Sequence, residues 1–311
     1  MSMIATRDAY GEVLAELGAE NENVVVLDAD LSGSTKTSGF AKKFPERFFN
    51  MGIAEANMIG TAAGLAAAGK IPFASTFAIF AVGRAWEQVR QSVAYPKANV
   101  KIVATHSGVT VGEDGGSHQA IEDIAIMRAV PNMTVIVPAD GVETKLAIRA
   151  AAAYKGPVYV RLGRNKVKTV VPEDFKFEIG KGVTLREGSD LTIIGTGLMT
   201  AQALAAAEQL QAAGISARVL HVATIKPLDE ELILAAARET GAIVTAEEHS
   251  IVGGLGGAVA ELLSEKCPTP LTRLGIKDRF GLSGKAEDLL KYFGLLAENI
   301  VDAAKEVLLK K

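Results

Sequence analysis

An acidic residue at the start of a predicted helix is the strongest candidate for chemistry in this sequence. Glu55 lies in the segment Gly-Ile-Ala-Glu-Ala-Asn-Met-Ile-Gly, residues 52–60. Four small residues follow at intervals of four: Ala56, Gly60, Gly64 and Ala68. One face of this helix therefore has little side-chain bulk and can approach another surface closely, which would bury the acid. The alternative is an acid that only complements the helix dipole.

A second group of reactive side chains occupies residues 105–119, after a predicted strand and before a helix expected near Gln119. This segment holds four glycines together with His106, Glu113, Asp114 and His118. Ligand sites of open parallel sheets lie at the carboxyl ends of the strands, where such a loop can gather polar groups around a small polyol. A solvated surface loop would explain the glycines and acids but not the paired histidines.

Two further pairs of residues follow predicted strands. Phe77 and Phe80 could sandwich a flat heterocycle, although core packing explains the same spacing. Arg161 and Arg164 could clamp a phosphate through their guanidinium groups. Two exposed arginines without a ligand are the alternative for the second pair.

Alternating strand and helix patterns must position these residues. Short β-branched segments alternate with longer alanine-rich helical segments, which is typical of parallel α/β units. In the first half, strands are expected near residues 24–28, 48–51, 71–73, 100–105, 134–137 and 158–160. In the second half they are expected near residues 191–195, 217–221, 242–246 and 271–274. The pattern lapses in between, so we predict an α/β protein with two parallel-sheet domains, residues 1–166 and 189–311, joined by a linker over 167–188.

Composition limits the class of protein. The chain has 311 residues, 49% of them hydrophobic, and a net charge of -3 with both signs well mixed. This balance gives no electrostatic footprint for nucleic acid or an anionic membrane. A single cysteine, Cys267, suits a reducing compartment, and the four histidines lack zinc-ligand spacing, so no metal site is predicted. Without a signal-peptide pattern or a spanning apolar run, we expect a soluble, cytoplasmic protein.

In their order along the chain, these segments resemble the carboxyl-terminal half of transketolase, a thiamine-diphosphate enzyme. That half consists of a pyrimidine-binding domain followed by a C-terminal domain, and the resemblance covers essentially the whole chain. Seven ordered matches carry it: Ala5-Thr6-Arg7, residues 28–34, Gly52-Ile53-Ala54-Glu55, Thr76-Phe77 with Phe80, Ala104-Thr105-His106, residues 112–115 with His118-Gln119, and Pro138-Ala139-Asp140.

The resemblance implies cofactor contacts for five of these residues. Glu55 looks like the carboxyl group that hydrogen-bonds the pyrimidine N1′ of thiamine diphosphate and so promotes loss of the C2 proton. Because burial disfavours a carboxylate, Glu55 could share a proton near neutral pH. Phe80, with Phe77 nearby, is similar to the aromatic residues that stack on the pyrimidine. Asp30 and Ile53 resemble residues that line the bent cofactor.

The same resemblance implies the reaction and the substrate contacts. A two-carbon glycolaldehyde unit would pass from a ketose phosphate to an aldose phosphate, with the cofactor as electron sink. Asp114 and His118 would contact groups near the scissile bond. The far part of the sugar phosphate would be held by Arg7, Ser34, His106 and Arg164.

Two departures from the family pattern shape the expectation. Gly83 stands where transketolases carry a larger side chain near the pyrimidine, which would leave that pocket more open. No segment matches the Gly-Asp-Gly…Asn element that holds Mg²⁺ and the diphosphate. We therefore expect a partner chain that carries the diphosphate-binding domain and most of the Mg²⁺ contacts, in an α2β2 assembly with the bare helix face as a place for close packing.

Three other functions remain open from the sequence. A 1-deoxyxylulose-phosphate synthase-like half and the β subunit of a 2-oxo acid dehydrogenase share the acid and the fold. A non-catalytic regulatory subunit could also keep the fold. Thr105-His106-Ser107 and Gly112-Glu113-Asp114 favour transketolase over the first two, and retention of Glu55, Asp114 and His118 together argues against the third.

Overall fold

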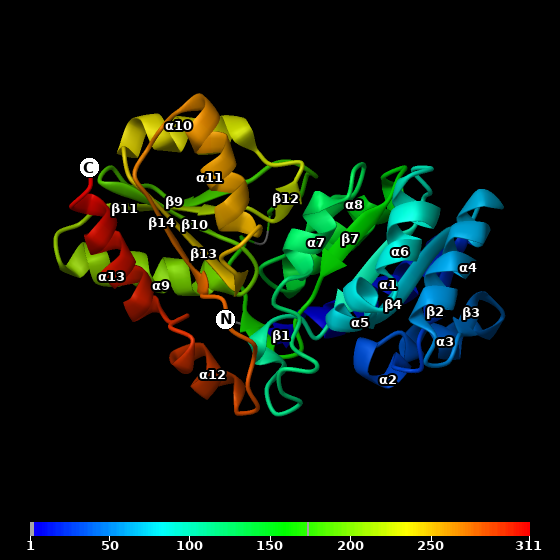
Figure 1. The fold of residues 1–311 in the computed structure, drawn as a ribbon. Helices are drawn as coiled ribbons and strands as arrows, with labels where there is room; N and C mark the ends of the chain where they lie inside the picture. Colours follow the sequence, from blue (N-terminus) through cyan, green and yellow to red (C-terminus); the bar gives the residue numbers. More distant parts are fainter. Residues whose placement is uncertain (1–2, 173) are drawn as a thin grey trace.

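The computed structural model describes residues 3–172 and 174–311. These residues form sheets of seven, five and two strands, arranged in two α/β halves that lie side by side (Figure 1). No helix in the described part of the chain is long and apolar enough to cross a membrane. The α/β class with two parallel-sheet halves, predicted from the sequence, is confirmed.

The sheet of the first half is parallel except at one edge. Its strands, in spatial order, are β12 (Thr224–Lys226), β6 (Thr134–Ile136), β7 (Val158–Arg161), β5 (Lys101–Thr105), β4 (Ile71–Phe77), β2 (Val24–Asp28) and β3 (Phe48–Asn50). Only β12 runs antiparallel to its neighbour within this described sheet. All five residues of β2 are buried, as a sheet covered on both faces requires.

Helices cover both faces of this sheet. On one face, α1 (Thr6–Glu20) and α8 (Gly141–Ala153) pack Tyr10, Leu14 and Ile148 onto the strands. The other face carries α4 (Glu55–Ala67), α5 (Ala78–Gly83), α6 (Trp86–Gln88), which continues as a π-helix over Val89–Ala94, and α7 (Asp123–Ala129). Two short helices, α2 (Ser32–Thr35) and α3 (Ser38–Lys43), follow β2.

The second half repeats the layered arrangement around a smaller sheet. Its strands, in spatial order, are β14 (Leu271–Ile276), β13 (Ile243–Ser250), β10 (Leu191–Gly195), β11 (Ala217–His221) and β9 (Val183–Arg186). One face is covered by α9 (Met199–Ala212) and α13 (Ala297–Leu308). The other is covered by α10 (Glu230–Thr240) and α11 (Leu255–Lys266), while α12 (Ala286–Tyr292) lies toward the first half.

Four strands were not predicted from the sequence. They are β1 (Met3–Ala5), β8 (Lys166–Lys168), β9 and β12. Three of them have only three residues, too few to show a period, and β8 is largely exposed with a lysine at each end. Because β1 pairs with β8 and β9 pairs with β11, the segment expected to be a linker contains regular structure. The domain bounds stay a prediction.

The two halves are joined by shared structure. Strand β12 comes from the second half but completes the first sheet beside β6. A second link is the ring of His221 in β11, which reaches Glu143 in α8 with 2.7 Å between Nε2 and the carboxylate, while its Nδ1 lies 2.7 Å from the Thr200 hydroxyl. Burial lowers the pKa of His221, but the charge and hydrogen bond of Glu143, together with smaller contributions from Gly195 and Asp140, raise it by more, so the net pKa is raised.

We expect this pair to make stability depend on pH. Because the folded pKa of His221 lies above its ordinary 6.5, the contribution is complete below that value and is lost as the pH rises through the raised pKa. His221→Gln should therefore cost roughly 3 kcal/mol at pH 6 and less at pH 9. Thermal unfolding of both proteins across that range measures the difference. Glu143→Gln, which removes the charge but keeps a hydrogen-bond acceptor, should show the same trend, and a difference that does not change with pH would contradict this role.

Candidate active site

Glu55 begins helix α4 and is buried, as predicted, with 3% of its surface exposed. Its carboxylate accepts a hydrogen bond from Arg84 at 2.8 Å between Nη1 and Oε1. The same guanidinium lies 4.0 Å from the centroid of the Phe80 ring. Arg84 was not predicted from the sequence, although it follows Phe80 by one helical turn and shares its side of α5. The acid thus has a specific partner besides the helix dipole.

Four rings connect Glu55 with the loop after β5. Phe77 ends β4 and its ring lies 5.8 Å from that of Phe80, with an angle of 14° between the planes. His106 stacks on Phe77 at 3.8 Å, and His118 meets Phe80 edge-on at 5.4 Å. Phe77 is buried, so the core-packing alternative holds in part for it, whereas Phe80 is half-buried. A Cβ on Gly83, three residues after Phe80, would meet no described atom within 4 Å, so the space at this position is open.

His106 is held in a neutral form by its contacts. Its backbone has φ +58°, and its ring stacks on Phe77. Arg7 Nη1 donates to His106 Nε2 at 3.1 Å and to the Ser34 carbonyl at 3.1 Å, so His106 Nδ1 carries the proton and faces the Thr105 hydroxyl at 2.8 Å. Burial, and after it the charges of Arg7 and Arg164, lower the pKa of His106 to about 3.

Two arginines, Arg7 and Arg164, flank His106 at one end of the site. Arg7 keeps one buried donor, Nε, without a hydrogen-bond partner in the described part of the chain. Arg164 Nη1 donates to the Val111 carbonyl at 2.6 Å, lies 3.5 Å from Asp114 Oδ2, and adds its charge to the field at Arg7 and His106. Two guanidinium groups around a neutral imidazole suit a phosphate or another compact anion.

Two predicted residues lie outside this group of contacts. Asp30 is exposed, has φ +63°, and accepts a hydrogen bond from Asn50 at 3.0 Å. Ile53 is 75% exposed. No contact in the described structure connects either side chain to the rings or the arginines, and their role toward a cofactor stays a prediction.

Arg161 is a buried side chain that is paired inside the protein, not an exposed arginine. It is buried because β7 lies inside the sheet, and its Nε pairs with Asp123 Oδ2 at 2.8 Å.

Helix α7 begins at Asp123, four residues after the start expected near Gln119. The reason is that Ala120 bridges Ser107 in a short parallel contact, which keeps the chain extended there.

The small-residue face of α4 is open. Met58 and Ile59 on the opposite side are fully buried, but a Cβ on Gly60 or Gly64 would meet no described atom within 4 Å. Another chain could therefore approach the α4 backbone beside Glu55.

Among the described residues, no group of three or more His, Cys, Asp or Glu side chains could hold a metal ion.

Two family descriptions match the chain: transketolase, pyrimidine binding domain, over residues 2–169, and transketolase, C-terminal domain, over residues 180–300. A Methanocaldococcus jannaschii protein, assigned as a transketolase C-terminal section, is 59% identical over 98% of this chain and 96% of its own length. The 6-deoxy-6-sulfo-D-fructose transketolase subunit of a Clostridium strain is 48% identical over 98% and 95%. A solved split-gene transketolase, an inactive beta4 tetramer, is 57% identical with a TM-score of 0.92 and covers 98% of this chain and 99% of its own.

We expect His106 to remain neutral across the physiological pH range. With a pKa of about 3, its ring resonances should not move between about pH 5 and 8 in nitrogen-15 spectra of the histidine-labelled chain. Arg7→Met should raise this pKa without restoring the ordinary 6.5, because burial is the larger cause of the shift. A His106 titration midpoint near 6.5 in the unaltered chain would show that the site is not closed around the ring.

Proposed function

Because this chain belongs to the transketolase family, we propose that it is the carboxyl-terminal subunit of a split transketolase. It would move a two-carbon glycolaldehyde unit from a ketose phosphate to an aldose phosphate. The observation that carries this proposal is the buried Glu55 at the head of α4, connected through Phe80 and Phe77 to an anion-binding group of arginines. One end of the site thus suits a heterocycle and the other a sugar phosphate.

The residues around Glu55 fit the pyrimidine of thiamine diphosphate, on which this family depends. The carboxyl of Glu55 would hold a hydrogen at the pyrimidine N1′, Phe80 would pack on the ring, and the space beside Gly83 would admit it. When bound, this cofactor supplies the carbon nucleophile and electron sink of the reaction. Arg84 would then share or release the Glu55 carboxylate, which it contacts in the chain alone.

The remaining residues of the site suit a sugar phosphate. Arg7 would offer an anion its Nε, which has no hydrogen-bond partner among the described residues, and Arg164 would add a second positive charge. Asp114 and His118 lie between this end and the rings, because Asp114 faces Arg164 and His118 faces Phe80. They would hold hydroxyl and carbonyl groups of the substrate near the bond that breaks.

A partner chain would complete the site. We propose that it carries the diphosphate-binding domain, supplies most contacts to Mg²⁺, and packs on the open face of α4 in an α2β2 assembly. Support comes from the relatives: one is assigned as a C-terminal section, one is named a subunit, and the beta4 tetramer of a split-gene transketolase is inactive.

We expect the isolated chain to lack transketolase activity and to gain it with a diphosphate-binding partner chain, thiamine diphosphate and Mg²⁺. A coupled assay with xylulose 5-phosphate and ribose 5-phosphate measures this. Because a relative is named for a sulfonated sugar, a parallel assay with 6-deoxy-6-sulfofructose compares the anionic ends of the donor. Full turnover by the isolated chain would contradict the split site.

Glu55→Ala should slow hydrogen exchange at C2 of the bound cofactor by about 10²–10⁴-fold, because the acid that assists proton loss is gone. Proton NMR of the reconstituted complex in deuterated water follows the exchange. Glu87→Ala is the matched control, since it removes an exposed acid from the neighbouring helix α6. Normal exchange in the Glu55 variant would remove this residue from its assigned role.

A further inference from the structure

The loop that carries Asp114 and His118 is hydrogen-bonded to the second half of the molecule at three places. Residues 106–119 are called the histidine loop below, and residues 277–285, between β14 and α12, are called the clamp segment. Ser283 of the clamp segment donates its hydroxyl hydrogen to the Glu113 carbonyl at 2.7 Å. At the start of the loop, the Thr110 amide donates to Oε1 of Glu248 in β13 at 2.6 Å. The C-terminal half thus contacts the backbone of the loop at Thr110 and again at Glu113.

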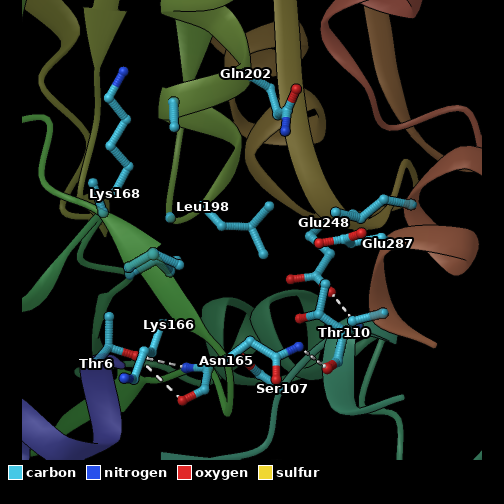
Figure 2. A pocket seen from close by; sticks show the side chains of 18 of the residues that line it. Thr6, Ser107, Thr110, Asn165, Lys166, Lys168, Leu198, Gln202, Glu248 and Glu287 are labelled. Atoms are coloured by element: carbon cyan, nitrogen blue, oxygen red, sulfur yellow. Dashed lines mark hydrogen bonds between the residues drawn. The ribbon is translucent and has the colours of Figure 1, made fainter. Parts of the chain in front are cut away.

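Glu248 is a buried side chain that none of the proposed steps uses. It reaches from β13 to Thr110 along the wall of a cavity of about 740 Å³ between the two halves (Figure 2). Its carboxyl group also touches Gly108, where φ is +74° and a Cβ would lie 2.3 Å from the Glu248 Cδ. Glycine at position 108 therefore lets the acid come close enough to bind the loop backbone.

Gln119 connects the two ends of the histidine loop with the clamp segment. Its buried amide nitrogen lies within hydrogen-bond distance of three carbonyls, those of Val109 at 3.2 Å, Gly112 at 3.1 Å and Leu282 at 2.8 Å, so one of its two hydrogens is shared between two of them. The contact between Gln119 and Leu282 depends on the neighbouring Gly281, because a Cβ at position 281 would lie 1.7 Å from the Gln119 Oε1. Glycine at 281 thus leaves room for this contact, and a larger residue there would displace the Gln119 amide.

We propose that the C-terminal half acts as a clamp that positions the histidine loop, with Glu248, Gly281 and Ser283 as positioning residues for Asp114 and His118. These three residues do not touch the proposed substrate. They fix the loop backbone, and the loop carries the side chains that would contact the sugar. This inference rests on the proposed function for the roles of Asp114 and His118, but the clamp itself is a property of the chain alone.

Hydrogen–deuterium exchange of the full chain tests the clamp without partner or cofactor. Amides of residues 106–119 should exchange about tenfold faster in Glu248→Ala, since one well-made hydrogen bond is lost, and in Gly281→Ala, where the new methyl group displaces Gln119. Glu248→Gln keeps an acceptor for the Thr110 amide and should retain the protection of the unaltered chain. Phe280→Ala is the control in the same segment, because this side chain is 84% exposed.

Exchange in the helices α9 and α13 should stay unchanged in every variant, which separates loosening of the loop from general unfolding. Unchanged exchange of the histidine loop in both Glu248→Ala and Gly281→Ala overturns the clamp, whatever the activity. In the reconstituted complex, turnover should fall about tenfold with the loosened loop while the affinity for thiamine diphosphate stays the same. A loosened loop with full turnover would leave the clamp standing and overturn the roles assigned to Asp114 and His118.

Discussion

The structure depends on one buried guanidinium group where both halves and the base of the histidine loop meet. Arg161 pairs with Asp123, which also accepts a hydrogen bond from Tyr159. The Nη2 of Arg161 donates to the backbone carbonyls of Ala120 and Glu248. A buried ion pair is tolerated only when the surrounding donors and acceptors are satisfied. Here burial is opposed by Asp123 and Glu248, and the net effect raises the pKa of Arg161. The loop and the second half thus share one charged anchor.

The arrangement of charge gives the site a direction. At one end the carboxylate of Glu55 has Arg84 as its counterion, and the Arg84 guanidinium lies over the face of the Phe80 ring. At the other end Arg7 and Arg164 surround His106, which stays neutral because a positive ring there would be buried among positive charges. The two ends of this site therefore differ in charge, one presenting a carboxylate and the other two guanidinium groups. The geometry therefore supports recognition of two unlike groups at once.

Local patterns in the sequence predicted much of this, and contacts between distant segments explain what they missed. Glu55 and the pair of phenylalanines could be selected because acid, glycine spacing and strand ends are visible in a few neighbouring residues. Arg84 needed only the spacing from Phe80, but Glu248 lies far along the chain from the loop it binds and has no local signal. Arg161 was misread because its type suggests an anion, whereas its place in an inner strand decides its burial.

Strand β12 has a consequence for the independence of the two halves. It belongs to the second half in sequence, yet it covers the edge of β6 in the first sheet. If the chain were divided at the predicted linker, the first fragment would keep β6 as an uncovered edge strand, which is prone to pair with other molecules. The second fragment would keep β12 without a sheet. The two halves are therefore not independent modules. A chimera that takes one half from a relative would have to keep β12 and β6 from the same protein.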